Sequence, residues 1–154
     1  MSIGLFLDTC NLYHCIKHKY GSQKKVDFSA YHKYVEDIGR IVVANAYGAK
    51  FNKSTDKFIK SLEEAGYTPV YKEVRISVDG TRRANQNVNI CLDSLSSDVK
   101  TVVLGSSDND LVPLVKTLKS KGKRVVVLSC TIGQALEKEA DVAIEIPYTF
   151  LRGK

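Results

Sequence analysis

Two acidic residues stand close together in the stretch LGSSDNDLVPLV, residues 104–115. Asp108 and Asp110 follow an apolar run and two serines, and they precede a segment with the spacing of an apolar helix face. One carboxylate is sufficient to cap a helix, and a second carboxylate nearby adds repulsion unless a cation or a proton lies between them. The pair therefore favours a site for a hard divalent cation such as Mg²⁺ or Mn²⁺, which prefers carboxylate and water oxygens.

A third acid ends another apolar run near the start of the chain. Residues 3–7 have the pattern of a buried strand, and Asp8 follows them directly. In open parallel sheets, ligands bind beyond the carboxyl ends of the strands, where the strand order reverses. The side chains expected to meet there, if the two strands are neighbours, are Asp8, Asn11, Ser106, Ser107, Asp108 and Asp110. Taken alone, either Asp8 or Asp108 has a structural alternative as a helix N-cap, which typically contributes about 1 kcal/mol.

Apolar runs alternate with amphipathic stretches along the whole chain. Strands are predicted at 3–7, 40–48, 68–76, 100–106, 124–129 and 141–146. After a polar loop that leads up to Asp27, helices are predicted at 28–38, from Ser54 or Thr55 to 65, at 86–95, from 111 to about 121, and at 133–140. This order predicts a single domain, residues 1–154, with a three-layer α/β/α sandwich around a mainly parallel sheet of five to six strands.

Composition narrows the range of partners. The 154 residues are 44% hydrophobic and 26% charged, with a net charge of +6, which is typical of a soluble globular protein with an anionic partner such as nucleic acid. No apolar segment approaches the roughly 18 residues that a membrane span needs. The four cysteines contain no Cys-x-x-Cys pair, so reduced thiols in a cytoplasmic protein are expected.

These residues resemble a known family. FLDTCN, followed downstream by LGSSDNDLVPLV and DVAIEI, is similar to the NYN domain, in the LabA-type branch of the PIN-like nuclease superfamily. The resemblance covers residues 3–146 and includes Pro113. It implies a PIN-like, Rossmannoid fold and a metal-dependent ribonuclease that hydrolyses RNA phosphodiesters with Mg²⁺ or Mn²⁺. Carried over by position, Asp8, Asp108 and Asp110 would be catalytic residues and metal ligands, and Asn11 would match the asparagine of the first motif.

One motif departs from the family pattern. The middle motif is commonly Lys-Gly-Val-Asp-Val-x-Leu-x-x-Asp, and the corresponding stretch here is ANQNVNICLD. Asn87 thus stands at the first aspartate, and Asp93, at the second, is a further candidate catalytic residue. An asparagine offers a carbonyl oxygen but no negative charge and no base. Residues 87 and 93 are about 240° apart around an ideal helix, so Asp93 should not replace the missing acid.

Three interpretations of Asn87 remain open: a weakened metal site, a nuclease with one tightly held ion, and a domain that binds RNA without cutting it. An engineered inactivating change is a further alternative. Substrate contacts are expected from Asn11, Ser106, Ser107, Asn87, and from Arg82 and Arg83 in the loop before the middle motif, although solvated charges are an equal alternative for the two arginines.

A phosphatase of the haloacid dehalogenase type needs Asp-x-Asp after the first strand, but Cys10 occupies the place of the second aspartate. The apolar C-terminal stretch DVAIEIPYTFL can pack internally or form a homodimer contact.

Overall fold

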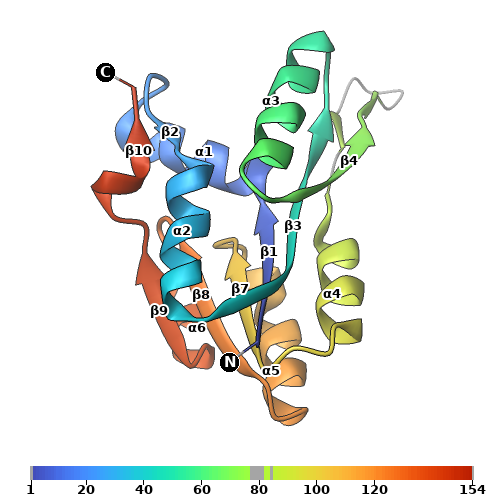
Figure 1. Ribbon diagram of the computed structural model, residues 1–154, viewed down its shortest axis with the longest axis vertical. Coiled ribbons are helices and arrows are strands. Elements are labelled where there is room, and N and C mark those ends of the chain that lie inside the picture. The colour runs from blue at the N-terminus through green and yellow to red at the C-terminus, as the bar shows by residue number, and fades with distance from the viewer. Residues whose placement is uncertain (1, 77–81, 84, 154) are drawn as a thin grey trace.

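The chain forms a six-stranded sheet in which each strand pairs in parallel with its neighbours (Figure 1). This computed structural model describes residues 2–76, 82–83 and 85–153. In spatial order, the strands are β4 (Thr68–Glu73), β3 (Arg40–Lys50), β1 (Ser2–Asp8), β7 (Thr101–Gly105), β8 (Arg124–Ser129) and β9 (Val142–Glu145). The predicted α/β fold with a mainly parallel sheet is confirmed.

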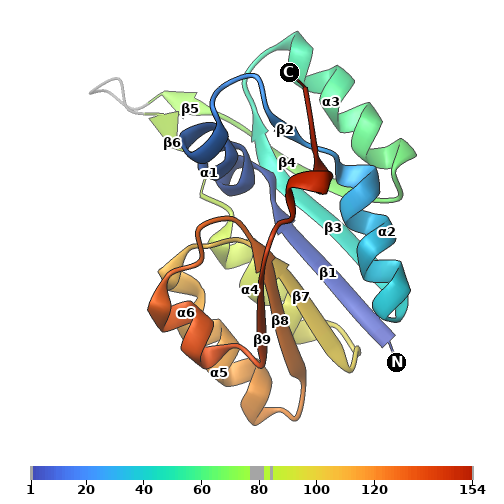
Figure 2. The ribbon, with the colours of Figure 1, turned by 90° about the vertical axis from the view of Figure 1, so that its left-hand side faces the viewer.

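Helices cover both faces of this sheet. Within the described residues they are α1 (Thr9–Tyr20), α2 (Phe28–Ile38), α3 (Lys53–Glu64), α4 (Asn87–Ser96), α5 (Val112–Ser120) and α6 (Gln134–Glu139). Buried side chains of α1, α2 and α3 belong to one apolar cluster, and those of α4, α5 and α6 belong to another. Figure 2 shows α2 and α3 on one side of the sheet and α4, α5 and α6 on the other.

The alternation of side chains along β1 explains the two clusters. Leu5 and Leu7 point into the first cluster, and Phe6 points into the second, with all three side chains 0% exposed. Successive strand residues face opposite sides of a sheet, so a strand that is covered on both faces must be apolar throughout. This requirement produces the continuous apolar runs seen in the sequence.

Strand β1 lies in the middle of the sheet, between β3 and β7. The chain leaves β1 to build β3 and β4 on one side, and later returns to build β7, β8 and β9 on the other. The strand order therefore reverses between β1 and β7. Leu7 is opposite Gly105 in this pairing, so Asp8 and Ser106 both follow directly at the carboxyl edge, and the expected neighbourhood of these two strands is confirmed.

The segment after β1 differs from the sequence prediction. Residues 9–20 form α1 rather than a polar loop. Its buried face consists of little more than Leu12 and Ile16, one turn apart, which is too few residues to give a clear periodic signal. Packing against the sheet supplies the stability that the local pattern does not reveal.

Two smaller features also differ. Strand β4 ends at Glu73 and not at the predicted residue 76. Arg75–Ile76 instead forms β5, which pairs in an antiparallel ladder with β6 (Arg82–Arg83). The N-cap of α3 is Asn52 rather than Ser54 or Thr55, since its side chain accepts a hydrogen bond from the Ser54 N–H.

A second antiparallel ladder joins the segment after α1 to the C-terminal end of the described chain. Strand β2 (Lys25–Val26) pairs with β10 (Leu151–Arg152), which follows the short 3₁₀ helix η2 (Tyr148–Phe150). No helix in the described part of the chain is both long and apolar enough to span a membrane.

Candidate functional site

Asp8 ends the central strand and begins the first helix. Its Oδ1 atom accepts a hydrogen bond from the Asn11 N–H at 3.0 Å, so Asp8 is the N-cap of α1. The side chain is partly buried. Burial raises the pKa of the Asp8 carboxyl, the Asn11 N–H opposes this shift, and the nearby Asp108 carboxylate adds to it. The structural alternative for Asp8 is therefore correct, but the cap offsets only part of the cost of burying its charge.

Asp108 lies in the turn after β7 and caps the 3₁₀ helix η1 (Asn109–Leu111). Its Oδ1 accepts the Asp110 N–H at 2.9 Å, and its Oδ2 accepts the side-chain amide of Asn87 at 2.9 Å. Its own N–H donates to Ser106 Oγ at 3.2 Å. Both carboxylate oxygens and the backbone of Asp108 are thus held in place by neighbouring groups.

Asp8 and Asp108 come together across the point where the strand order reverses. They follow adjacent parallel strands, and the repulsion between them contributes to the raised pKa of Asp8. Two carboxylates in a partly buried setting repel more strongly than they do in bulk water. A cation between them would relieve this repulsion.

A second set of contacts fixes α1 to the turn after β7. Asn11 Oδ1 accepts hydrogen bonds from the Ser107 N–H at 3.0 Å and from Ser107 Oγ at 3.1 Å. Cys15 Sγ lies 3.1 Å from the same hydroxyl. The structure therefore brings Asn11 and Ser107 together beside the two aspartates. The sequence prediction did not include Cys15, because its contact with Ser107 depends on residues 9–20 forming a helix.

Gln86 positions Asn87. Its amide nitrogen donates to the carbonyl oxygens of Gly48 and Val70 at 2.9 and 3.0 Å, and the side chain is only 2% exposed. These bonds tie the start of α4 to strands β3 and β4, next to the turn that carries Asp108. Gln86 was also missed, because a lone glutamine gives no pattern that a sequence reading can use.

The other two candidate aspartates differ in their relation to this pair. Asp110 is exposed and contacts Asp108 through its backbone N–H. Asp93 accepts a hydrogen bond from the Tyr47 hydroxyl at 2.7 Å, and Asn45 donates to that hydroxyl at 3.1 Å. Among the contacts of the described residues, none joins Asp93 to Asp8 or Asp108, in agreement with the helical angle expected from the sequence.

The arginines before the middle motif are placed only by their backbone. Arg82 and Arg83 form β6 and pair with Ile76 and Arg75 of β5. Their side chains lie outside the part that the structure describes. Their predicted contact with substrate therefore stays a prediction.

The donor set has the chemistry of a site for one hard cation. Asp8 and Asp108 supply carboxylate oxygens, which are the donors that a hard cation prefers, whereas the Asn87 amide presents its N–H side to Asp108. Within residues 2–76, 82–83 and 85–153, however, no three His, Cys, Asp or Glu side chains are grouped so that they could hold a metal ion. Mg²⁺ is commonly bound by one or two carboxylates and retains several waters, so this arrangement fits a single hydrated ion better than a pair of ions.

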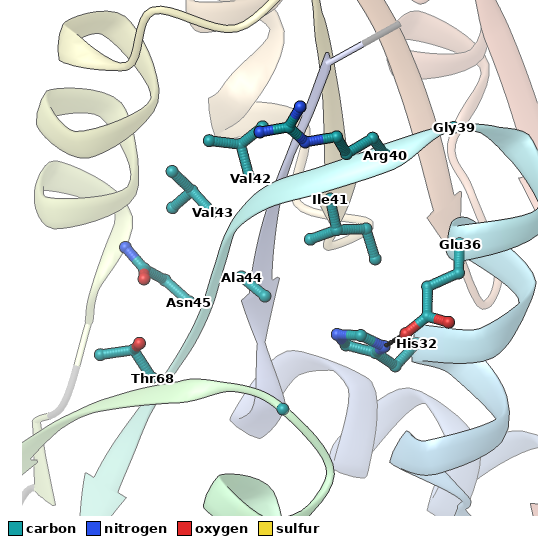
Figure 3. Close-up of a pocket in the computed structure, with 11 residues that line it drawn as sticks. His32, Glu36, Gly39, Arg40, Ile41, Val42, Val43, Ala44, Asn45 and Thr68 are labelled. Atoms are coloured by element: carbon teal, nitrogen blue, oxygen red, sulfur yellow. Dashed lines mark ion pairs between the residues drawn. The ribbon is translucent and has the colours of Figure 1, made fainter.

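A separate pocket of about 670 Å³ lies at the opposite edge of the sheet (Figure 3). It is lined by the amino ends of β3 and β4 and by α2, where His32 and Glu36 form an ion pair at 2.7 Å. None of the site residues predicted from the sequence lines it. Ligands of open parallel sheets bind at the carboxyl edge, so this pocket does not change the placement of the candidate site.

Comparison with known proteins gives consistent results. A solved structure of a protein of unknown function from Vibrio parahaemolyticus superposes with a TM-score of 0.89 at 25% identity, covering 98% of this chain and 96% of that one. An uncharacterized protein of Methanocaldococcus jannaschii is 24% identical over 127 residues, which are 81% of this chain but 50% of the relative. The chain thus spans about half the length of this curated relative. The NYN domain profile matches residues 2–147, so the chain belongs to the NYN domain family.

Proposed function

We propose that this protein is a metal-dependent ribonuclease that hydrolyses phosphodiester bonds at the carboxyl edge of the sheet. The observation that carries the proposal is the meeting of Asp8 and Asp108 across the strand-order reversal. Membership of the NYN family supports it, because this family belongs to the PIN-like nuclease superfamily. The net charge of +6 suits a polyanionic substrate.

Asp8 and Asp108 are the proposed ligands of one Mg²⁺ or Mn²⁺ ion, with Asp110 reaching it directly or through water. When bound, the ion lowers the pKa of a water molecule and neutralises charge on the phosphoryl oxygens. Asn87 has a different role from these carboxylates. Its amide holds Asp108 Oδ2, and a rotation of this amide would turn its carbonyl oxygen toward the ion or its waters.

The backbone and hydroxyl groups nearby have a role in substrate contact. Ser107 stands at the start of the turn, where Asn11 holds it in place. Hydroxyl and N–H groups of this kind bind phosphate oxygens. Ser106 is only 1% exposed and its hydroxyl accepts the Asp108 N–H, so its predicted substrate contact stays a prediction. Asp93 does not enter the metal site of this proposal, because its carboxylate is engaged with Tyr47; its catalytic role stays a prediction.

A second function is favoured by the hydrogen bond between Asn87 and Asp108. This bond satisfies Asp108 Oδ2 without a cation, and fewer than three acids are grouped among the described residues. An RNA-binding or regulatory protein that does not cut its ligand accounts for both facts. The cytoplasmic location, the LabA-type branch, the homodimer and the single-domain organisation also stay predictions.

Cleavage of an end-labelled single-stranded RNA tests the two functions against each other. With Mn²⁺, we expect cleavage by the unchanged protein, a loss of at least about 100-fold in Asp108→Asn, and none in EDTA, because metal stabilisation of the transition state is worth several kcal/mol. Ser96→Ala, an exposed position at the end of α4, serves as a purification control. Equal cleavage by all proteins would mean a contaminating nuclease, and no cleavage with retained RNA binding would favour the second function.

A further inference from the structure

The segment that follows Asp8 carries most of the chain's excess positive charge. Residues 9–26 contain four lysines, two histidines and no acid, and thus account for +4 of the net +6. Among the described residues, no ion pair involves any of these lysines. A positive charge concentrated in this way, without ion pairs, is the electrostatic feature of a surface that binds a polyanion.

Aromatic rings accompany these charges along one face of α1. Tyr13, Lys17 and Tyr20 are spaced at i, i+4 and i+7, which places them in one row. Lys17 Nζ lies 5.9 Å from the centre of the Tyr13 ring. The row continues onto Tyr148, whose ring contacts that of Tyr20 edge to face at 5.8 Å and lies 5.0 Å from Lys24 Nζ. These five residues define the α1 surface.

The rings at the two ends of the α1 surface are available to a ligand. Tyr13 is 47% exposed and Tyr148 is 59% exposed. Large aromatic side chains gain stability by burial, so two exposed tyrosines that are each next to a lysine need a reason. Stacking of nucleobases on such rings, with lysines on the phosphates, is the common arrangement of proteins that bind single strands.

The ladder beside the α1 surface gives independent support. Lys25 of β2 and Arg152 of β10 are direct cross-strand partners, and both are exposed. Like charges in this position destabilise a ladder. An anion bound beside them would reverse that effect. In Figure 1, α1, β2 and β10 lie together at the upper left, so the two features belong to one region of the molecule.

The α1 surface starts at the candidate active site. Asp8 caps α1, and Tyr13 and His14 are exposed residues of the helix shortly after this cap. Tyr13 and His14 are in edge contact at 5.3 Å. A strand whose phosphate lies at Asp8 and Asp108 can therefore continue along α1 toward Tyr148.

We propose that the α1 surface binds single-stranded RNA, with bases stacked on Tyr13 and Tyr148 and phosphates held by Lys17 and Lys24. The inference rests on the proposed function for the identity of the ligand. A duplex does not fit this mode, because its bases are stacked on each other and cannot reach the tyrosine rings.

Fluorescence anisotropy of an end-labelled oligouridine in EDTA tests the α1 surface, because binding is then measured without cleavage. Tyr13→Ala is expected to weaken binding about 5- to 100-fold, and Tyr13→Phe, which keeps the ring, to bind within about twofold of the unchanged protein. Lys17→Ala should flatten the slope of log K against log salt by about 0.7, the value for one phosphate contact on a single strand. Lys116→Ala, at an exposed lysine on α5, is the control. It should change the affinity and the salt slope no more than the loss of any other surface charge does.

The outcomes separate this inference from the proposed function. Normal binding by Tyr13→Ala and Lys17→Ala, in proteins with unchanged circular dichroism, would overturn the α1 surface even if RNA is cleaved. Loss of binding in these variants without any cleavage by the parent protein would uphold the surface and reject the nuclease. Equal affinity for a duplex, or competition by polyglutamate as effective as that by RNA, would overturn the assignment to single strands.

Discussion

The side-chain amide of Asn87 donates a 2.9 Å hydrogen bond to Oδ2 of Asp108. An aspartate at position 87 would place a third carboxylate there and could donate no such bond. Compared with an aspartate, the asparagine therefore lowers the negative charge of the site by one. Its hydrogen bond also stabilises the Asp108 carboxylate without a cation. The departure from the family motif at position 87 therefore changes both the charge of the site and the hydrogen bonding of Asp108.

Asn87→Asp should make folding stability dependent on a divalent cation. Without metal, a new carboxylate faces Asp108, and we expect a fall in melting temperature of about 2–4 °C for each kcal/mol of added repulsion. With excess Mn²⁺ the loss should be recovered or exceeded, because a ligand that binds only the folded state stabilises it. Thermal unfolding in EDTA and in Mn²⁺ measures both effects.

Asn89→Asp is the matched control for this substitution. It adds the same charge to α4, where the native amide contacts Gln86 at 2.7 Å rather than Asp108. Its melting temperature should respond to Mn²⁺ no more than that of the unchanged protein. An equal response in the two variants would show that the added charge acts at long range and not in the proposed site.

The raised pKa of Asp8 predicts a pH-dependent stability. A carboxyl whose pKa is raised on folding contributes stability below its unfolded value, about 3.9, and loses it as the pH rises through the folded value. At neutral pH in EDTA, ionised Asp8 is therefore destabilising, and Asp8→Asn should raise the melting temperature. The amide oxygen can still accept the Asn11 N–H, so the cap is retained.

The gain from Asp8→Asn should disappear at low pH, where Asp8 of the parent protein is protonated as well. Thermal unfolding at neutral pH and below pH of about 4 measures the difference. A gain that is the same at both pH values would contradict the assigned cause, since it would not depend on ionisation.

Sequence patterns predicted those parts of the candidate site that depend on local sequence. Asp8 and Asp108 follow apolar strands, and the rule for parallel sheets brings such residues to one edge. The contact between Asn87 and Asp108 could not be predicted in this way, because it depends on Gln86 fixing α4 to β3 and β4. Helix α1 was missed because its apolar face is too narrow for a periodic signal.

Tyr47→Phe should test the contact that engages Asp93. The substitution removes the hydroxyl that donates to Asp93 Oδ2 and accepts from Asn45. Loss of a hydrogen bond to a charged, partly buried group costs about 1–3 kcal/mol, and urea unfolding measures it. Mn²⁺ affinity should change less than about twofold, which corresponds to about 0.4 kcal/mol, because Asp93 is not a ligand in the proposed site.

The companion variant Asp93→Asn distinguishes two roles for this residue. We expect lower stability with cleavage reduced only in proportion to the folded fraction. Cleavage abolished in a variant with unchanged stability would instead uphold the catalytic role predicted from the sequence.

Gly105→Ala should disturb the alignment of the two strands that carry the acids. A Cβ atom at this position would overlap the Leu7 side chain and lie 3.0 Å from the Tyr31 hydroxyl. Overpacking of a core typically costs about 1–3 kcal/mol, and here it would push β7 away from β1. We expect a lower melting temperature together with weaker Mn²⁺ binding, measured by calorimetry. Weaker stability with unchanged Mn²⁺ affinity would show that the cation does not need both strands.

The most direct test of the central claim is an anomalous difference map from a crystal soaked in Mn²⁺. We predict a single peak in coordination contact with the carboxylates of Asp8 and Asp108, with the Asn87 amide turned so that its oxygen faces the ion or one of its waters. A map without a peak at saturating Mn²⁺, in which the Asn87 amide still donates to Asp108, would contradict the account.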